Sequence, residues 1–250
     1  MMTLEFFSGG KPLAVSTKTK HVVRDQLARQ IIGGELKADM VLPNELDLAR
    51  DYGVSRTTIR DVLQSLEEKG LLERKTYKGT RIRSIHSWNL LDAEVLNWSC
   101  GIMTQRRFFS SLMELRLIIE PQAAALAAIR NNDLELQTIR DAFDWMNIDG
   151  QRIDPEGDVA FHHSIIKASG NMFVAQFGGA IRAALHHTIY LSGKEAIDQG
   201  QSIENHRQLL HAIENHDARS SYAIMSRILK ITVADLGLSE SEIILADCLP

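Results

Sequence analysis

The strongest pattern of apolar and polar positions lies between Val54 and Gly70. Four aliphatic residues recur there at intervals of three and four, the spacing that places side chains on one face of a helix: Ile59, Val62, Leu63 and Leu66. Ser55 is suited to cap the first turn of this helix, and Gly70 is suited to end it. The pattern therefore predicts an amphipathic helix whose apolar face packs against the rest of a domain.

The opposite side of this helix begins with cationic and hydroxyl side chains, Arg56, Thr57 and Arg60. Cations at a helix N-terminus oppose the macrodipole, which favours anions there. Because free backbone N–H groups also point outward at that end, this turn is suited to bind a polyanion. A solvent-exposed face with scattered charges is the alternative interpretation.

Two further helices are predicted before this one. An apolar pattern over His21–Ile32 ends at Gly33, and a second helix is expected to begin near Glu45 and to close at Tyr52. Only Gly53 and Val54 then separate the second helix from the cap of the third. So short a connection, with a glycine inside it, is typical of a helix-turn-helix.

The segment that follows, residues 71–83, is short and basic, since five of its thirteen residues are Lys or Arg. We interpret it as two short strands around a turn at Lys78-Gly79. Added to the three helices, this hairpin predicts a winged helix-turn-helix over residues 18–84. A flexible arm is expected before it, at residues 1–17.

Beyond residue 105 the apolar patterns are helical, and Gly, Asn and Asp residues separate them. They predict helices at about 105–130, 133–147, 155–168, 171–192, 201–215 and 217–236. A linker at 85–104, rich in Trp and Leu, is expected to dock as a helix. The expected fold is mainly α: a winged helix-turn-helix with a small β-wing, then an all-helical bundle at 105–240 and a tail at 241–250.

Charge is distributed unevenly along the chain, although the net charge is only −4. Residues 1–85 carry 15 Lys/Arg against 11 Asp/Glu, whereas residues 86–250 carry 13 against 21. This asymmetry indicates that only the first part meets nucleic acid. No apolar run approaches the roughly 18–20 residues that span a bilayer. Two distant cysteines, Cys100 and Cys248, make no disulfide framework, so we expect a cytoplasmic protein without a membrane partner.

Three residues of the second part form a candidate metal site. Asp158 and His162 are four residues apart and share a helix face, and His206 lies on a later predicted helix. An Asp/His/His set suits a divalent transition metal such as zinc. The alternative is that each histidine is an ordinary core residue with satisfied hydrogen bonds.

Arg116 is a second candidate for chemistry in this part. It precedes Glu120 by four residues, so a simple ion pair along the helix is one interpretation. Its neighbours are apolar nearly all round, which favours burial of part of this helix. A buried guanidinium needs an anionic partner, and its planar fork suits a carboxylate.

The motifs of the first domain resemble those of the GntR family of bacterial transcription regulators. They are Leu42-Pro43 with Glu45, Leu48-Ala49, the run Val54–Arg60, and the run Leu66–Leu72. The resemblance implies that Ser55, Arg56, Thr57 and Arg60 contact bases and phosphates in the major groove, and that Lys78 and Gly79 enter the minor groove. Members often carry arginine where this chain has Leu46, so one DNA contact is expected to be missing. Because so short a helix covers few base pairs, tight binding predicts a dimer on a palindromic site.

The second domain resembles the FCD effector domain of the FadR subfamily. The resemblance rests on Glu114-Leu115-Arg116 with Glu120, Asp158 with Phe161-His162, Ser169-Gly170-Asn171, and Asn205-His206. It implies a metal held by one Asp and three His, of which Asp158, His162 and His206 match. Ile228 stands where the last histidine is expected. Water or effector oxygens could complete the shell, another histidine (His163, His186, His187 or His211) could substitute, or these residues could bind the effector without metal.

The resemblance also implies an effector. Arg116, His162 and Asn171 would line a polar pocket, with Asp158 and His206, for a small hydroxy acid. The linker motif Trp88–Asp92 looks like that of regulators of sugar-acid catabolism, in particular galactonate-responsive repressors. The expected function is therefore a dimeric repressor that releases its operator when it binds a galactonate-like carboxylate.

Three other functions are alternatives to this one. A regulator that responds to acyl-CoA would have no need of converging metal ligands. A metal-dependent hydrolase would use Asp158, His162 and His206, but no recognisable motif places a general base beside them, so an enzyme is not expected. A nucleoid or RNA-binding protein does not explain the acidic second part.

Overall fold

The computed structural model describes residues 20–75, 77–102, 106–182, 185 and 199–238. The chain divides into two compact units, Met1–Asn89 and Leu90–Pro250, so that the predicted linker at 85–104 is shared between them. Each unit is described by itself. Within the described residues, no helix is both long enough and apolar enough to cross a membrane.

The first unit contains the three predicted helices, α1 (Lys20–Ile32), α2 (Glu45–Tyr52) and α3 (Arg56–Glu68). Helix α3 packs against both α1 and α2, and all four aliphatic residues of its predicted apolar face are buried. The connection between α2 and α3 is short because Gly53 adopts a left-handed conformation, with φ of 68°, and closes α2. The predicted helix-turn-helix is confirmed.

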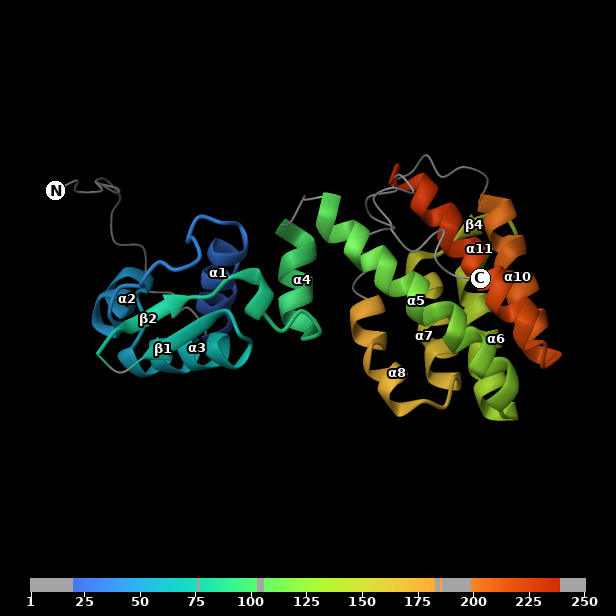
Figure 1. The fold of residues 1–250 in the computed structure, drawn as a ribbon, viewed down its shortest axis with the longest axis horizontal. Coiled ribbons are helices and arrows are strands. Elements are labelled where there is room, and N and C mark those ends of the chain that lie inside the picture. The colour runs from blue at the N-terminus through green and yellow to red at the C-terminus, as the bar shows by residue number, and fades with distance from the viewer. Residues whose placement is uncertain (1–19, 76, 103–105, 183–184, 186–198, 239–250) are drawn as a thin grey trace. The chain divides into compact units, whose positions relative to one another are not determined.

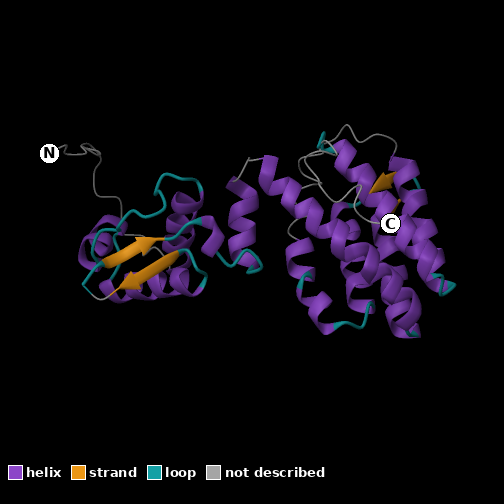
Figure 2. Cartoon of the chain, in the orientation of Figure 1, coloured by secondary structure: helices purple, strands orange, loops and turns teal. Residues whose placement is uncertain are grey.

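The wing is a two-stranded antiparallel sheet of β1 (Leu72–Lys75) and β2 (Gly79–Ile82), drawn as arrows in Figure 2. Its register pairs Leu72 with Ile82 and Lys75 with Gly79, and the Leu72 and Ile82 side chains are buried. A 3-10 helix, η1 (Ile85–Ser87), follows the sheet. Gly70, between α3 and β1, has a φ of 80°, and a Cβ there would lie 2.2 Å from the Ser87 carbonyl oxygen, so only glycine fits.

The second unit is a helical bundle with α5 at its centre (Figure 1). Helices α7, α10 and α11 pack against α5, and α6 packs against α7 and α10. Its described elements are α4 (Ala93–Ile102), α5 (Arg106–Arg130), α6 (Asp133–Met146), β3 (Asn147–Ile148), β4 (Arg152–Ile153), α7 (Pro155–Ala168), α8 (Met172–Gln176), α10 (Gln199–Glu214) and α11 (Ala218–Asp235). The main core of the unit is drawn from α5, α6, α7, α10 and α11. The predicted all-helical bundle is confirmed.

Three local features differ from or sharpen the prediction. The helix expected over 171–192 is interrupted, because α8 ends at Gln176, a turn follows at Phe177, and helix resumes at 178–182. Gly178 and Gly179 explain the break, since glycine weakens helix propagation. Strands β3 and β4, of two residues each, form a hairpin too short to show an alternating apolar pattern. Asp149 and Gly150, in the turn between the strands, both have positive φ. Helix α4, expected as a docked linker helix, packs through Leu96 and Cys100 against α5 of the second unit.

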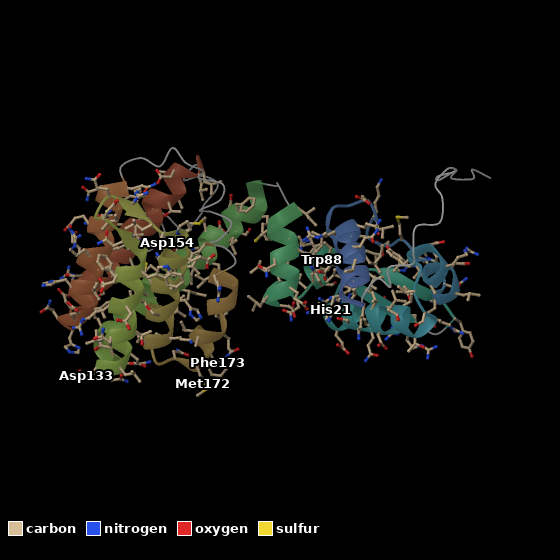
Figure 3. The ribbon with its side chains drawn as sticks, turned by 180° about the vertical axis from the view of Figure 1, so that it is seen from behind. His21, Trp88, Asp133, Asp154, Met172 and Phe173 are labelled. Carbon is tan, nitrogen blue, oxygen red and sulfur yellow. The ribbon has the colours of Figure 1, made fainter. Side chains whose placement is uncertain are left out.

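The short helix α8 exposes two of its apolar side chains. Met172 and Phe173 lie on its exposed side, and both are labelled in Figure 3. Asn171 caps this helix, since its side-chain oxygen accepts hydrogen bonds from the backbone N–H groups of Phe173 and Val174. The amide oxygen of Asn171 is therefore occupied locally.

Candidate functional site

The candidate recognition surface of the first unit is built on the first turn of α3. The Ser55 hydroxyl accepts a hydrogen bond from the Thr58 backbone N–H, which is the predicted N-cap. This cap begins α3 at Arg56 and so presents Arg56, Thr57 and Arg60 on its exposed side. The three side chains lie on one surface, as the sequence predicted.

Glu45, at the start of α2, holds both arginines. Its Oε2 accepts from Arg56 Nε at 3.0 Å and from Arg60 Nη2 at 3.3 Å. The hydrogen bond from Arg60 lowers the pKa of the Glu45 carboxyl, and Arg56 acts in the same direction. The two arginine side chains remain 63% and 54% exposed, so their remaining N–H groups face solvent.

The tip of the wing is fully exposed. Lys78 and Gly79 lie at the turn between β1 and β2, and Gly79 has a φ of 78°. Tyr77 precedes them with a φ of 67°, which is unusual for a residue with a side chain, and it makes no packing contact that would reduce its exposure. Leu46 occupies the position where family members often carry an arginine that contacts DNA, and its side chain is also exposed.

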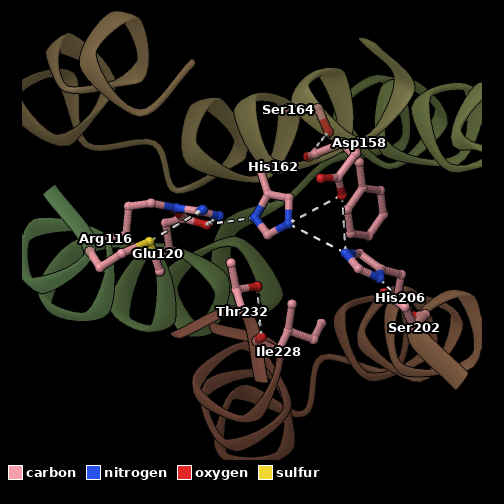
Figure 4. Close-up of polar contacts among 11 residues, drawn as sticks. Arg116, Glu120, Asp158, His162, Ser164, Ser202, His206, Ile228 and Thr232 are labelled. Atoms are coloured by element: carbon pink, nitrogen blue, oxygen red, sulfur yellow. Dashed lines mark hydrogen bonds and ion pairs between the residues drawn. The ribbon is translucent and has the colours of Figure 1, made fainter. Parts of the chain in front are cut away.

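In the second unit, the structure brings together the three predicted metal ligands. Asp154 caps α7 through the backbone N–H groups of Glu156 and Gly157, and Pro155 occupies the first turn. Helix α7 then places Asp158 and His162 on one face, opposite His206 of α10. The Asp158 Oδ1 atom lies 3.2 Å from His206 Nε2 and 3.6 Å from His162 Nε2, and the two Nε2 atoms are 3.4 Å apart (Figure 4).

Hydrogen bonds at the far side of each ring orient both histidines toward this triangle. Nδ1 of His206 lies 2.7 Å from the Ser202 carbonyl oxygen, and Nδ1 of His162 lies 2.5 Å from Glu120 Oε2. A carbonyl and a carboxylate accept hydrogen bonds only, so each Nδ1 carries the proton. In the neutral rings, both Nε2 atoms therefore direct lone pairs at the centre of the triangle.

The triangle has the dimensions of a metal site. With metal–ligand distances of about 2.0–2.1 Å, two ligand atoms of a tetrahedral zinc site lie about 3.3–3.4 Å apart. The three measured separations bracket that value. Asp158 Oδ1 is buried without a hydrogen-bond partner, and three converging acceptors without a proton between them need a cation. Among the described residues, these three form the one group of metal-ligating side chains.

The set fits a divalent metal with three protein ligands and an open position. Ile228 lies on α11 within the hydrophobic core, and its aliphatic side chain offers no ligand atom. Of the histidines that could substitute, the His163 ring lies against Gly178, and His211 lies on the exposed side of α10 beside Asn215. His186 and His187 lie outside the described residues.

Arg116 and Glu120 form a buried pair beside the triangle. The Arg116 Nε atom lies 2.5 Å from Glu120 Oε1, and Nη2 lies 3.5 Å from Oε2. Within the described part of the chain, the remaining terminal nitrogen, Nη1, has only the Met113 sulfur as a partner, at 3.9 Å. Burial raises the pKa of the Glu120 carboxyl, but the charges of Arg116 and His162 outweigh burial and lower it to about 2.

The same opposing effects act on the pKa of the Asp158 carboxyl. Burial raises its pKa, whereas His206 and His162, when they carry a proton on Nε2, act together with Arg116 to lower it to about 2. It is therefore ionised at neutral pH. An ionised carboxylate beside two imidazole nitrogens is the form that binds a divalent cation.

Two functional contacts could not be read from the sequence. Glu45 was recognised as part of a motif, but its contact with both arginines depends on the angle between α2 and α3. Glu120 was recognised as the helical partner of Arg116, but its contact with His162 depends on how α5 packs against α7. The i,i+4 spacing of Arg116 and Glu120 was the one available signal for the second contact.

Comparison with known proteins identifies both units. Residues 19–82 match the family described as bacterial regulatory proteins, gntR family, and residues 111–230 match the FCD domain. The galactonate operon transcriptional repressor of Escherichia coli (strain K12) is 32% identical over 197 residues, which are 76% of this chain and 85% of the repressor. A regulatory protein of the same organism, named for the L-lactate dehydrogenase operon, is 28% identical over 202 residues, 78% of each chain.

A solved structure shares the fold. The structure of Lar, described as controlling the Listeria monocytogenes agr system, has a TM-score of 0.60 and 18% identity, and covers 88% of this chain and 97% of Lar. The curated relatives are transcription regulators and not enzymes, and they favour neither the hydrolase nor the acyl-CoA alternative. This chain belongs to the GntR family of bacterial transcription regulators, with an FCD domain as its second unit, and is a DNA-binding transcriptional regulator.

Proposed function

We propose that this protein is a repressor that binds a palindromic operator as a homodimer and releases it when a sugar acid or similar 2-hydroxy acid binds the second unit. The observation that carries the proposal is the Asp158–His162–His206 triangle in a chain 32% identical to a galactonate operon repressor. Galactonate and L-lactate, which appear in the names of two relatives, are both 2-hydroxy carboxylates. Their shared chemistry supports an effector of that class.

On the DNA side, the proposal assigns Arg56 and Arg60 to base edges and phosphates of the major groove. Arginine bonds bidentately to guanine, and each such pair discriminates by about 1–3 kcal/mol. Ser55 and Thr57 would contact phosphates, and Lys78 and Gly79 would approach the neighbouring minor groove. Glu45 supports this assignment, because it holds both guanidinium groups on the exposed side of α3 before DNA arrives.

On the effector side, Asp158, His162 and His206 would hold a divalent metal such as zinc. When bound, the metal would supply a Lewis-acid centre for carboxylate and hydroxyl oxygens. The Arg116 side chain is buried, and among the described residues its Nη1 has only a thioether contact, so it is a candidate donor to the effector carboxylate. Asn171 is a weaker candidate, since its amide oxygen caps α8.

The effector would act on DNA binding through linkage. If it favours an arrangement of the dimer whose two DNA-binding units no longer match both half-sites, affinity for the operator falls. Couplings of this kind amount to about 1–3 kcal/mol. A homodimer on a palindrome follows from the small reach of one recognition helix.

Thermal unfolding of metal-stripped and zinc-loaded protein with a panel of ligands tests the proposal. A ligand that binds only the folded protein stabilises it by about 2.7 kcal/mol at a hundred times its Kd. We expect zinc-dependent stabilisation by galactonate or lactate. Galactose, which lacks the carboxylate, and propionate, which lacks the hydroxyl, are the matched controls. Stabilisation by acyl-CoA alone would contradict the effector assignment.

A further inference from the structure

Among the residues that the structure describes, Glu120 is the one carboxylate in direct contact with both Arg116 and a predicted metal ligand. It is completely buried on α5, with Oε1 turned to Arg116 Nε and Oε2 turned to His162 Nδ1, each at 2.5 Å. Figure 4 shows His162 between Glu120 on one side and Asp158 with His206 on the other. The three side chains Arg116, Glu120 and His162 therefore form a continuous chain that ends at the triangle.

The two histidines of the triangle are supported differently. Behind His206 stands a neutral acceptor, the Ser202 carbonyl oxygen of the preceding turn, which any residue at position 202 would supply. The Nδ1 atom of His162 instead meets a side-chain carboxylate of another helix, Glu120 of α5. A carboxylate acceptor polarises an imidazole more strongly than a carbonyl does, which makes its free nitrogen a better metal ligand and fixes the ring.

We propose that Glu120 is a positioning residue for the metal site: it holds His162 in the Nδ1–H tautomer, with Nε2 directed at the metal, and Arg116 acts on the site through Glu120. This inference rests on the proposed function for the metal but not for the effector or the operator. Arg116 contributes by fixing the orientation of Glu120, since two N–H groups of the guanidinium face the carboxylate. The role depends on the packing of α5 against α7.

The tautomer of His162 is the first measurement, and it needs neither metal nor variant. Long-range 1H–15N correlation spectra of histidine-labelled, metal-free protein at a pH where the ring is neutral distinguish the two tautomers. The His162→Gln variant assigns the signal. We expect Nδ1–H for His162 in the wild type, and we expect this preference to weaken in Glu120→Gln, whose side-chain amide can donate as well as accept. An Nε2–H tautomer in the wild type would overturn the inference.

Zinc affinity, measured by competition with a chromophoric chelator, is the second measurement. Loss of such a supporting partner costs about 10–100-fold in metal affinity, and we expect a loss in that range for Glu120→Gln. Glu214→Gln is the matched control, because it removes a glutamate that pairs with Arg140 in the same unit, two turns beyond His206. Its zinc affinity should equal that of the wild type. Equal affinities for Glu120→Gln and the control would overturn the inference.

A variant that fails to fold does not end the test. Glu120→Gln leaves the Arg116 guanidinium buried without its anion, so the double variant Arg116→Met/Glu120→Gln removes both charges together. It should show the same loss of zinc affinity as the single variant. Failure of the wild type to bind zinc or cobalt, with His162 still in the Nδ1–H form, would overturn the metal part of the proposed function and the metal role of Glu120, and it would leave the tautomer assignment standing.

Discussion

Each unit contains a glutamate that accepts hydrogen bonds from two basic side chains, and the surroundings of these two glutamates differ completely. In the first unit, Glu45 is 25% exposed and binds two arginines that are more than half exposed. In the second unit, Glu120 is fully buried, and its partners Arg116 and His162 are each 2% exposed in their side chains. The chemical groups are similar, but water screens the first cluster and not the second.

This difference decides what each cluster can do. An exposed ion pair contributes about 0–1 kcal/mol, so its arginines can be transferred to DNA phosphates or bases at little cost. A buried pair cannot be opened cheaply, because each charge left alone has lost its hydration. The exposed cluster is therefore suited to bind a partner that arrives, whereas the buried cluster is suited to hold a site in one geometry.

The largest expected effect is loss of the buried partner. Glu120→Ala leaves the Arg116 charge buried and unpaired, and removal of one member of such a pair costs about 3–5 kcal/mol. Urea unfolding of the metal-free protein measures this change in the free energy of unfolding. The double variant Arg116→Met/Glu120→Leu should lose less than the single variant, because no charge is left without its partner. If Glu120→Ala lowers the free energy of unfolding by less than about 1 kcal/mol, the buried cluster contributes no more to stability than an exposed ion pair does.

Loss of an exposed arginine should affect DNA binding and not folding. Arg56→Ala removes a predicted base contact worth about 1–3 kcal/mol, so we expect operator affinity to fall about 5- to 150-fold with the melting temperature nearly unchanged. Fluorescence anisotropy with a selected operator measures the affinity. Arg152→Ala, which removes an exposed arginine paired with Asp149 in the second unit, is the control. If Arg56→Ala binds the operator as tightly as this control, the assignment of α3 as the recognition helix is wrong.

The same contrast explains what sequence reasoning could predict. Local signals were sufficient for α3, because Ser55 as its cap and the aliphatic repeat act within one helix. They also placed Asp158 and His162 on one helix face. The contacts of Glu120 with His162 and of Glu45 with both arginines join different helices, and their existence depends on packing angles that no short pattern encodes. The break at Phe177 was missed because the apolar pattern continues through Gly178 and Gly179.

Removing the charge of Glu45 should change the stability of the protein far less than removing Glu120. Glu45→Gln removes an exposed ion-pair acceptor and a negative charge at the start of α2, and each contributes at most about 1 kcal/mol to folding. The change also removes an anion beside two DNA-facing arginines, so non-specific DNA affinity should rise rather than fall. Titrations at two salt concentrations measure this. Destabilisation as large as that of Glu120→Ala would contradict the distinction between the two clusters.

The smallest expected effect concerns the wing, where exposure is complete and only the backbone is constrained. Tyr77 is 103% exposed and has a φ of 67°, a conformation that costs a residue with a Cβ about 1–2 kcal/mol. Tyr77→Gly relieves this cost but gives the unfolded chain more freedom, which offsets about 0.4–1 kcal/mol. The free energy of unfolding of the first unit should therefore rise, by at most about 1.6 kcal/mol.

Tyr77→Ala separates the backbone from the ring in this experiment. It keeps the Cβ and the positive φ but removes the aromatic side chain, and a ring that packs against nothing should contribute nothing to folding. Urea unfolding followed by a probe in the first unit should give alanine a stability equal to that of the wild type and glycine a higher one. A glycine variant less stable than the alanine variant would mean that the strain at the wing tip is absent, because only the added freedom of the unfolded chain would then distinguish the two variants. A lower free energy of unfolding in Tyr77→Ala would mean that the Tyr77 ring makes a stabilising contact despite its exposure. The wing tip would then contribute to folding through its side chain as well as its backbone.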